Sequence, residues 1–211
     1  PLRSAEVIYG TARLPGDVRE MCPNLKWIHL AGTGVDRLDF EGVMDGSILV
    51  TNSRGALGFP IAQSIVMLML SLVKDVPKLL QQQRAHVWQR YITQDLDGKT
   101  LALIGLGAIG GSLASLGRAF QMRTLATRHS ATEHSYDVDG VDEVFPPSQL
   151  HDMLSQADFV AITAPLTDET RGLIGKQELA IMKPTAYIFN VGRGPIIDQS
   201  ALIDSLKNGG I

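Results

Sequence analysis

Cysteine is nearly absent from this chain, because Cys22 is the only one among its 211 residues. A single thiol excludes an internal disulfide and is typical of a protein from a reducing compartment. We therefore expect a cytoplasmic protein. No evident base partner lies near Cys22 in the sequence, which favours an ordinary core or surface thiol over a nucleophile.

The sequence also lacks clusters of positive charge and long hydrophobic runs. The formal net charge is -3 and no basic block or stripe is present, so we expect no nucleic-acid partner. The longest apolar stretch, Ile65–Val73, is interrupted by Ser71; it is too short to span a bilayer and predicts a buried helix. We see no signal peptide and no metal-ligand set, and we expect no membrane contact. The hydrophobic content, 45%, suits one or two globular domains.

The most informative stretch is a glycine-rich turn. Gly105, Gly107 and Gly110 follow the apolar run Leu101–Ile104 in the spacing G-x-G-x-x-G, and Ile109–Phe120 predicts a helix after them. In this context the first glycine turns the chain, the second lets the backbone approach a pyrophosphate, and the third lets helix and strand pack closely. Unpaired N–H groups at the helix N-terminus would hold the phosphates. A glycine-rich turn that binds nothing is the alternative.

Strands and helices alternate along the chain, which predicts an α/β fold with a parallel sheet. Pro77 should bend or break the longest helix, Asp198 should cap the last one, and residues 129–140 should form a polar loop. The expected strands are 5–9, 27–30, 48–50, 101–104, 123–127, 159–163 and 186–191. The expected helices are 16–21, 60–83, 109–120, 148–155, 176–182 and 200–207.

Six segments, in this order and with these spacings, resemble the D-isomer-specific 2-hydroxyacid dehydrogenase family, and the resemblance covers essentially the whole chain. The segments are LAGTGVD (30–36), TNSRG (51–55), GLGAIG (105–110), ATRHS (126–130), APLTDETRGLI (164–174) and NVGRGPIID (190–198). The resemblance implies a partial flavodoxin-like α/β substrate domain over residues 1–56. A C-terminally incomplete NAD(P)-binding Rossmann domain would follow over residues 57–211, with an interdomain helix and a dimer arm.

The resemblance also implies a reaction and the residues that bind the substrate. The family moves a hydride between a nicotinamide and C2 of a small 2-oxo or 2-hydroxy acid, such as glyoxylate or hydroxypyruvate. Its catalytic arginine maps onto Arg193, whose planar fork can hold a carboxylate and a carbonyl oxygen together. Backbone N–H groups of Gly32, Thr33 and Gly34 should also meet the carboxylate. The alternatives are a surface arginine in a loop and an ordinary strand-to-helix connection.

The resemblance further implies a cofactor site. NAD-preferring members carry an acid after the second strand of the Rossmann domain, whereas this chain has Arg128, which suits a 2′-phosphate. We therefore expect NADP as the preferred cofactor, with NAD also usable; the alternative is that Arg128 points to solvent and NAD is used. The expected cofactor-binding residues are Gly105, Gly107, Ala108, Ile109, Gly110, Arg128, His129, Ser130, Ala164, Pro165, Thr170, Val191, Gly192 and Arg193.

The family's catalytic Glu and His lie downstream of the NVGRG segment, and the sequence ends before either. None of the five histidines takes that place. Both ends look cut, so a partial chain and a naturally truncated relative both fit; we favour the partial chain, because a half-finished sheet would expose an apolar edge. We expect no substantial dehydrogenase activity from these 211 residues.

Three alternatives stay open. A homodimer is predicted from the apolar helix within residues 60–83 and the arm anchored by Trp88. The alternative is that these segments serve core packing only. A non-catalytic dinucleotide-sensing or partner-binding protein, like the family's corepressor relatives, is the second function, and the downstream Glu and Pro-His pair would discriminate it from an enzyme. A Rossmann methyltransferase or flavoprotein would explain the glycine turn but not Arg193.

Overall fold

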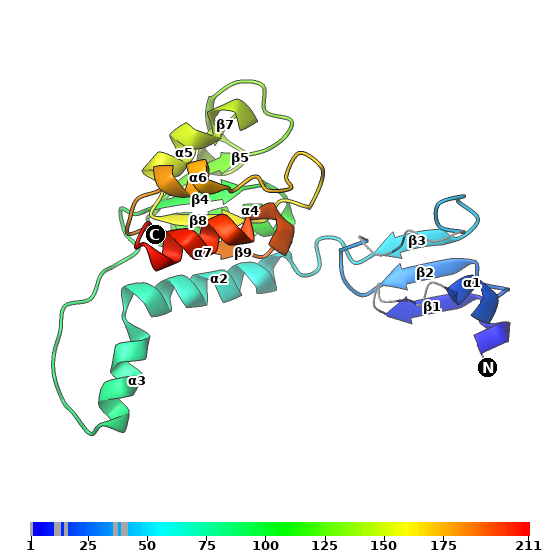
Figure 1. Cartoon of the computed structure of the whole chain (residues 1–211), viewed down its shortest axis with the longest axis horizontal. Coiled ribbons are helices and arrows are strands. Elements are labelled where there is room, and N and C mark those ends of the chain that lie inside the picture. Colours follow the sequence, from blue (N-terminus) through cyan, green and yellow to red (C-terminus); the bar gives the residue numbers. More distant parts are fainter. Residues whose placement is uncertain (1, 11–13, 15–16, 36–37, 39–41) are drawn as a thin grey trace. The chain divides into compact units, whose positions relative to one another are not determined.

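A computed structural model describes residues 2–10, 14, 17–35, 38 and 42–211. The chain divides into two compact units, Pro1–Leu57 and Gly58–Ile211, and each is described by itself (Figure 1). The sequence places this boundary after residue 56, one residue earlier.

The first unit is built on a three-stranded parallel sheet in the order β1-β2-β3. The strands are Val7–Gly10 (β1), Trp27–Leu30 (β2) and Leu49–Asn52 (β3), with a 3-10 turn at Leu2–Ser4 (η1) and a helix at Val18–Met21 (α1). Ile28 and Leu30 of β2 pack with Val18 and Cys22 in its core, so the lone cysteine is a buried thiol. The expected helix start at Gly16 lies outside the described residues.

The second unit is a six-stranded sheet in the order β6-β7-β5-β4-β8-β9, parallel except for β6. The strand order reverses at β4, because the chain first proceeds to β5 and β7 and then returns on the other side to β8 and β9. This is the doubly wound topology expected of a Rossmann domain. The strands are Thr100–Ile104 (β4), Arg123–Thr127 (β5), Ser135–Val138 (β6), Val141–Phe145 (β7), Phe159–Ile162 (β8) and Tyr187–Asn190 (β9).

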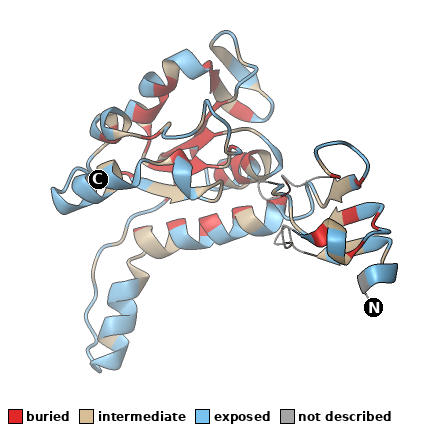
Figure 2. Ribbon diagram, turned by 45° about the vertical axis from the view of Figure 1, so that its right-hand side comes forward, coloured by how far each residue is buried: buried red, intermediate tan, exposed pale blue. Residues whose placement is uncertain are grey.

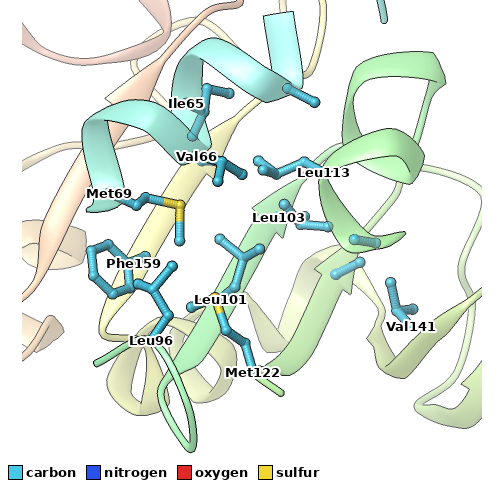
Figure 3. Close-up of a cluster of buried hydrophobic side chains, with 14 of the residues drawn as sticks. Ile65, Val66, Met69, Leu96, Leu101, Leu103, Leu113, Met122, Val141 and Phe159 are labelled. Atoms are coloured by element: carbon cyan, nitrogen blue, oxygen red, sulfur yellow. The ribbon is translucent and has the colours of Figure 1, made fainter. Parts of the chain in front are cut away.

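Helices cover both faces of this sheet, so its central strands are buried on both sides (Figure 2). Leu101 and Leu103 of β4 pack with α2 and α4 in one cluster (Figure 3), while Ala102 and Ile104 face the other cluster. This alternation explains the continuous apolar run. The helices are Gly58–Val73 (α2), Val76–Arg84 (α3), Ala108–Ala119 (α4), Leu150–Gln156 (α5), Lys176–Ile181 (α6) and Gln199–Lys207 (α7), with 3-10 turns at Pro147–Gln149 (η2) and Gly194–Ile196 (η3).

The expected polar loop over residues 129–140 is wrong in part. Its second half is strand β6, and the unpredicted β7 follows, so the two form an antiparallel hairpin at the sheet edge. Their acidic residues hide the strand pattern, although the structure pairs them: Asp142 accepts hydrogen bonds from the N–H and hydroxyl of Thr124. The dipeptide Asp139-Gly140, with φ of 54° and 77°, forms the turn and was the available hairpin signal.

The expected break near Pro77 and the expected cap at Asp198 are confirmed. Helix α2 ends at Val73, α3 begins at Val76, and the two are bent by 63°; Asp75 takes a left-handed conformation between them, and Pro77 lies in the first turn of α3. The Asp198 carboxylate accepts the N–H groups of Ser200 and Ala201 at the start of α7.

No single helix in the described part of the chain is long and apolar enough to cross a membrane. The bent pair of α2 and α3 meets that test only jointly, by length and composition.

Candidate functional site

The carboxyl ends of four neighbouring strands form a row in the order β5, β4, β8 and β9. Hydrogen bonds tie the loops of this row together. The Gly105 N–H donates to the Thr127 carbonyl (2.9 Å), the Thr163 hydroxyl donates to the Gly105 carbonyl (2.6 Å), and the Gly192 N–H donates to the Ile162 carbonyl (3.1 Å). With about 4.8 Å between strands, the row spans about 14 Å. It includes the point of strand-order reversal, where such sheets bind ligands.

The glycine turn between β4 and α4 has the conformation that its spacing predicts. Gly105 has φ of +101°, and a Cβ there would lie 2.8 Å from the Ala164 nitrogen. A Cβ on Gly110 would lie only 2.2 Å from the Gly105 carbonyl oxygen, whereas a Cβ on Gly107 would meet nothing within 4 Å. The fold itself therefore requires Gly105 and Gly110, and the open space at Gly107 leaves room for a ligand.

The first turn of α4 fits a phosphate. Its first helical hydrogen bond runs from the Gly111 N–H to the Gly107 carbonyl (2.8 Å), so the amides of Ala108, Ile109 and Gly110 precede it. No side chain caps this helix at Gly107. The N–H groups and the helix dipole at the edge of the sheet favour an anion there.

The end of β5 holds two buried polar atoms without a partner among the described residues, Thr127 Oγ1 and Arg128 Nε. The Nη1 of Arg128 donates to the carboxylate of Asp139 in the β6–β7 turn. Arg128 therefore neither points freely into solvent nor stands unpaired at the sheet edge. His129 and Ser130 are exposed in the turn that follows. Unsatisfied donors of this kind fit the ribose and phosphate oxygens of a dinucleotide.

The loop after β8 contains three of the expected cofactor residues, and each of them has a different environment. Ala164 is buried against the glycine turn, and Pro165 is exposed. The hydroxyl of Thr170 donates to the Pro165 carbonyl (2.8 Å) and accepts the Thr167 N–H (2.7 Å), so it organises the loop.

The same loop holds Glu169. A hydrogen bond from Thr167 keeps the pKa of this carboxyl group below its usual value.

The loop after β9 is shaped by Asn190, which sequence reasoning missed. Its side-chain amide donates to the Arg193 carbonyl (2.9 Å), and its oxygen accepts the Gly192 N–H (3.1 Å). A Cβ on Gly192 would lie 2.5 Å from the Ala164 carbonyl oxygen, so the close packing of these two loops requires glycine at this position. Val191 and Arg193 are half-buried, and Arg193 Nη1 donates to the Gly192 carbonyl (2.8 Å). An asparagine directly before a V-G-R-G turn was the available signal.

The turn Gly32-Thr33-Gly34 follows β2 in the first unit. The Asn52 side chain donates to the Thr33 carbonyl (2.9 Å), and the Ser53 N–H donates to the Gly32 carbonyl (3.3 Å). Within the described residues, the N–H groups of the three turn residues have no acceptor. They stay a predicted substrate contact. In the same part of the chain, no group of three or more His, Cys, Asp or Glu could hold a metal ion.

Residues 66–211 match the model of the D-isomer specific 2-hydroxyacid dehydrogenase NAD binding domain. The chain belongs to this family. It is 32% identical to glyoxylate/hydroxypyruvate reductase B of Yersinia pestis over 220 residues, covering 100% of this chain and 65% of that protein. The chain therefore spans less than two thirds of that relative's length.

Two solved structures of the 2-hydroxyacid dehydrogenase family resemble the chain. A protein from Aeromonas salmonicida is 30% identical with a TM-score of 0.89, covering 99% of this chain and 66% of that one. A protein from Xanthobacter autotrophicus, solved with NADPH and MES, is 27% identical with a TM-score of 0.79, covering 97% and 64%. The family and the Rossmann fold expected from the six segments are confirmed.

Proposed function

We propose that the complete protein is an oxidoreductase that transfers a hydride between NADP(H), in preference to NAD(H), and a small 2-oxo or 2-hydroxy acid such as glyoxylate or hydroxypyruvate. One observation carries the proposal. In the row of loops, the glycine turn whose amides fit a phosphate follows β4, and the half-buried Arg193 follows β9, two strands away. A named relative, the Yersinia reductase, supports the substrate class.

The residues of the row have separate tasks in this proposal. The amides of Ala108, Ile109 and Gly110 bind the pyrophosphate, and Arg128, His129 and Ser130 meet the adenosine ribose. Ala164, Pro165, Thr170, Val191 and Gly192 line the pocket of the nicotinamide, which supplies the hydride when it is bound. These assignments follow the order of the strands, from β5 to β9.

Arg193 orients the acid. Its guanidinium can hold the carboxylate and the carbonyl oxygen of the same molecule, since its donors form a rigid fork. Asn190 fixes the backbone of the loop from which Arg193 extends. The amides of Gly32, Thr33 and Gly34 would supply neutral donors to the same carboxylate.

NADP preference is supported by the residue that follows β5. A carboxylate there would repel a 2′-phosphate, whereas the Arg128 guanidinium attracts one, and its Nε has no partner within the described chain. The Xanthobacter neighbour was solved with NADPH.

The proposed activity is tested on the complete protein with NADPH and each 2-oxo acid, by following loss of cofactor absorbance. We expect turnover of glyoxylate and hydroxypyruvate and much slower turnover of glycolaldehyde, which lacks the carboxylate that Arg193 binds. NADPH should bind more tightly than NADH. Equal rates with and without the carboxylate, or no turnover by protein that binds NADPH, would refute the proposed substrate class.

A cytoplasmic homodimer is the assembly that we propose. Helix α3 and the segment that follows it support this proposal. None of the residues of α3 is buried, and the side chains of Trp88 and Ile92 are 95% and 99% exposed. Large exposed apolar side chains gathered on one segment are typical of an interface.

Replacing Trp88 with serine should weaken this dimer. Aromatic anchors dominate interface energies, so the dimer dissociation constant should rise at least about tenfold in light scattering over a dilution series. Tyr136→Ser, which removes a 68% exposed aromatic from the hairpin, is the control and should leave the dimer unchanged. A chain that is monomeric at every concentration would contradict the proposal.

A further inference from the structure

Arg128 is paired with an acidic side chain of the β6–β7 turn. Its Nη1 donates to the carboxylate of Asp139, and both side chains are partly exposed, 39% and 45%. Its Nε is buried and has no partner in the described chain. One end of the guanidinium is therefore occupied by a carboxylate, while another donor is left unsatisfied.

The acidic partner of Arg128 comes from a neighbouring element of the same sheet. Strand β7 pairs with β5 in parallel, and Asp139 lies in the turn that joins β6 to β7. The ion pair therefore links the residue that follows β5 to the β6–β7 hairpin.

The hairpin is held firmly enough to act as a fixed partner. Asp139 and Gly140 both have positive φ in its two-residue turn, and this geometry fixes the register. Strand β7 is joined to β5 by the ion pair of Arg123 with Glu143 and by the bonds of Asp142 to Thr124.

We propose that Asp139 is a specificity-determining residue of the cofactor site, because its carboxylate competes with the 2′-phosphate of NADP for the Arg128 guanidinium. The inference rests on the proposed function and deepens it. A 2′-phosphate must displace or share this partner to bind the guanidinium, whereas NAD, which has no such phosphate, does not compete for it. Asp139 thus lowers the preference for NADP below that which Arg128 alone would confer.

The test compares Asp139→Asn with Asp137→Asn in the full chain, by titrating NADPH and NADH and following cofactor fluorescence. Asp137 has a φ of 50°, is exposed and lies in the same hairpin, so its variant removes the same charge without breaking the ion pair. Asparagine tolerates this left-handed conformation, so both variants should fold. We expect Asp139→Asn to lower the NADPH dissociation constant about fivefold and to change that for NADH less than about twofold.

A second pair of variants isolates the arginine. In an Arg128→Gln background, Asp139→Asn should change the NADPH dissociation constant less than about twofold. In that background no guanidinium is present for the carboxylate and the 2′-phosphate to compete for. Equal NADPH-to-NADH ratios for Asp139→Asn and Asp137→Asn would overturn the inference and leave the proposed function intact. Failure of every folded variant to bind either dinucleotide would overturn both.

Discussion

Replacing Gly110 with alanine is expected to lower the free energy of unfolding by about 3 kcal/mol. The new Cβ would lie 2.2 Å from the Gly105 carbonyl oxygen and 3.1 Å from Thr163 Oγ1. Neither neighbour can give way easily, because one is backbone and the other is the hydroxyl that bonds to it. Helix α4 would have to move away from β4, although its Leu113 and Ala114 are packed in the core. The melting temperature should fall by about 6–12 °C.

Gly111→Ala is the matched control for this experiment. It adds the same methyl group one residue later in the same helix, where nothing lies within 4 Å of the new atom. Alanine favours a helix over glycine by roughly 0.5–1 kcal/mol, so the melting temperature should stay the same or rise slightly. Equal melting temperatures for the two variants would contradict the close packing of α4 on the glycine turn.

Replacing Arg193 with alanine is expected to lower kcat/KM for the 2-oxo acid about 100-fold in the complete protein. A charge-assisted contact to the substrate is worth about 1.5–3 kcal/mol, and Arg193 would make more than one. Because the proposed role is to hold the acid, the dissociation constant for NADPH should change less than about threefold. Arg193→Lys should recover part of the rate, since it keeps the charge but loses the planar fork.

Arg171→Ala is the control for Arg193. Arg171 is an exposed arginine in the loop after β8, and its variant removes the same charge from the same edge of the sheet. Steady-state rates and melting temperatures should be measured for all three variants. A loss of rate in Arg171→Ala as large as that in Arg193→Ala would show a general charge effect and remove the specific role of Arg193.

Local rules made the glycine turn predictable. An apolar run, a G-x-G-x-x-G spacing and a helical pattern follow one another within residues 101–120, and each depends on backbone sterics or burial rather than on distant contacts. The caps and breaks at Asp198 and Pro77 were predictable for the same reason. Strand β6 and strand β7 were not, because Asp142 and Glu143 look like loop residues until Thr124 and Arg123 stand beside them.

The candidate site divides in the same way. The family, the turn that fits a pyrophosphate, and the arginines Arg128 and Arg193 could all be read from the sequence, because they depend on residue type and spacing along the chain. The folded structure was needed to see that Ala164 fills the space between Gly105 and Gly192, and that Arg128 is paired with Asp139. A side chain's partner depends on the register of neighbouring strands, and this register joins residues far apart in the chain.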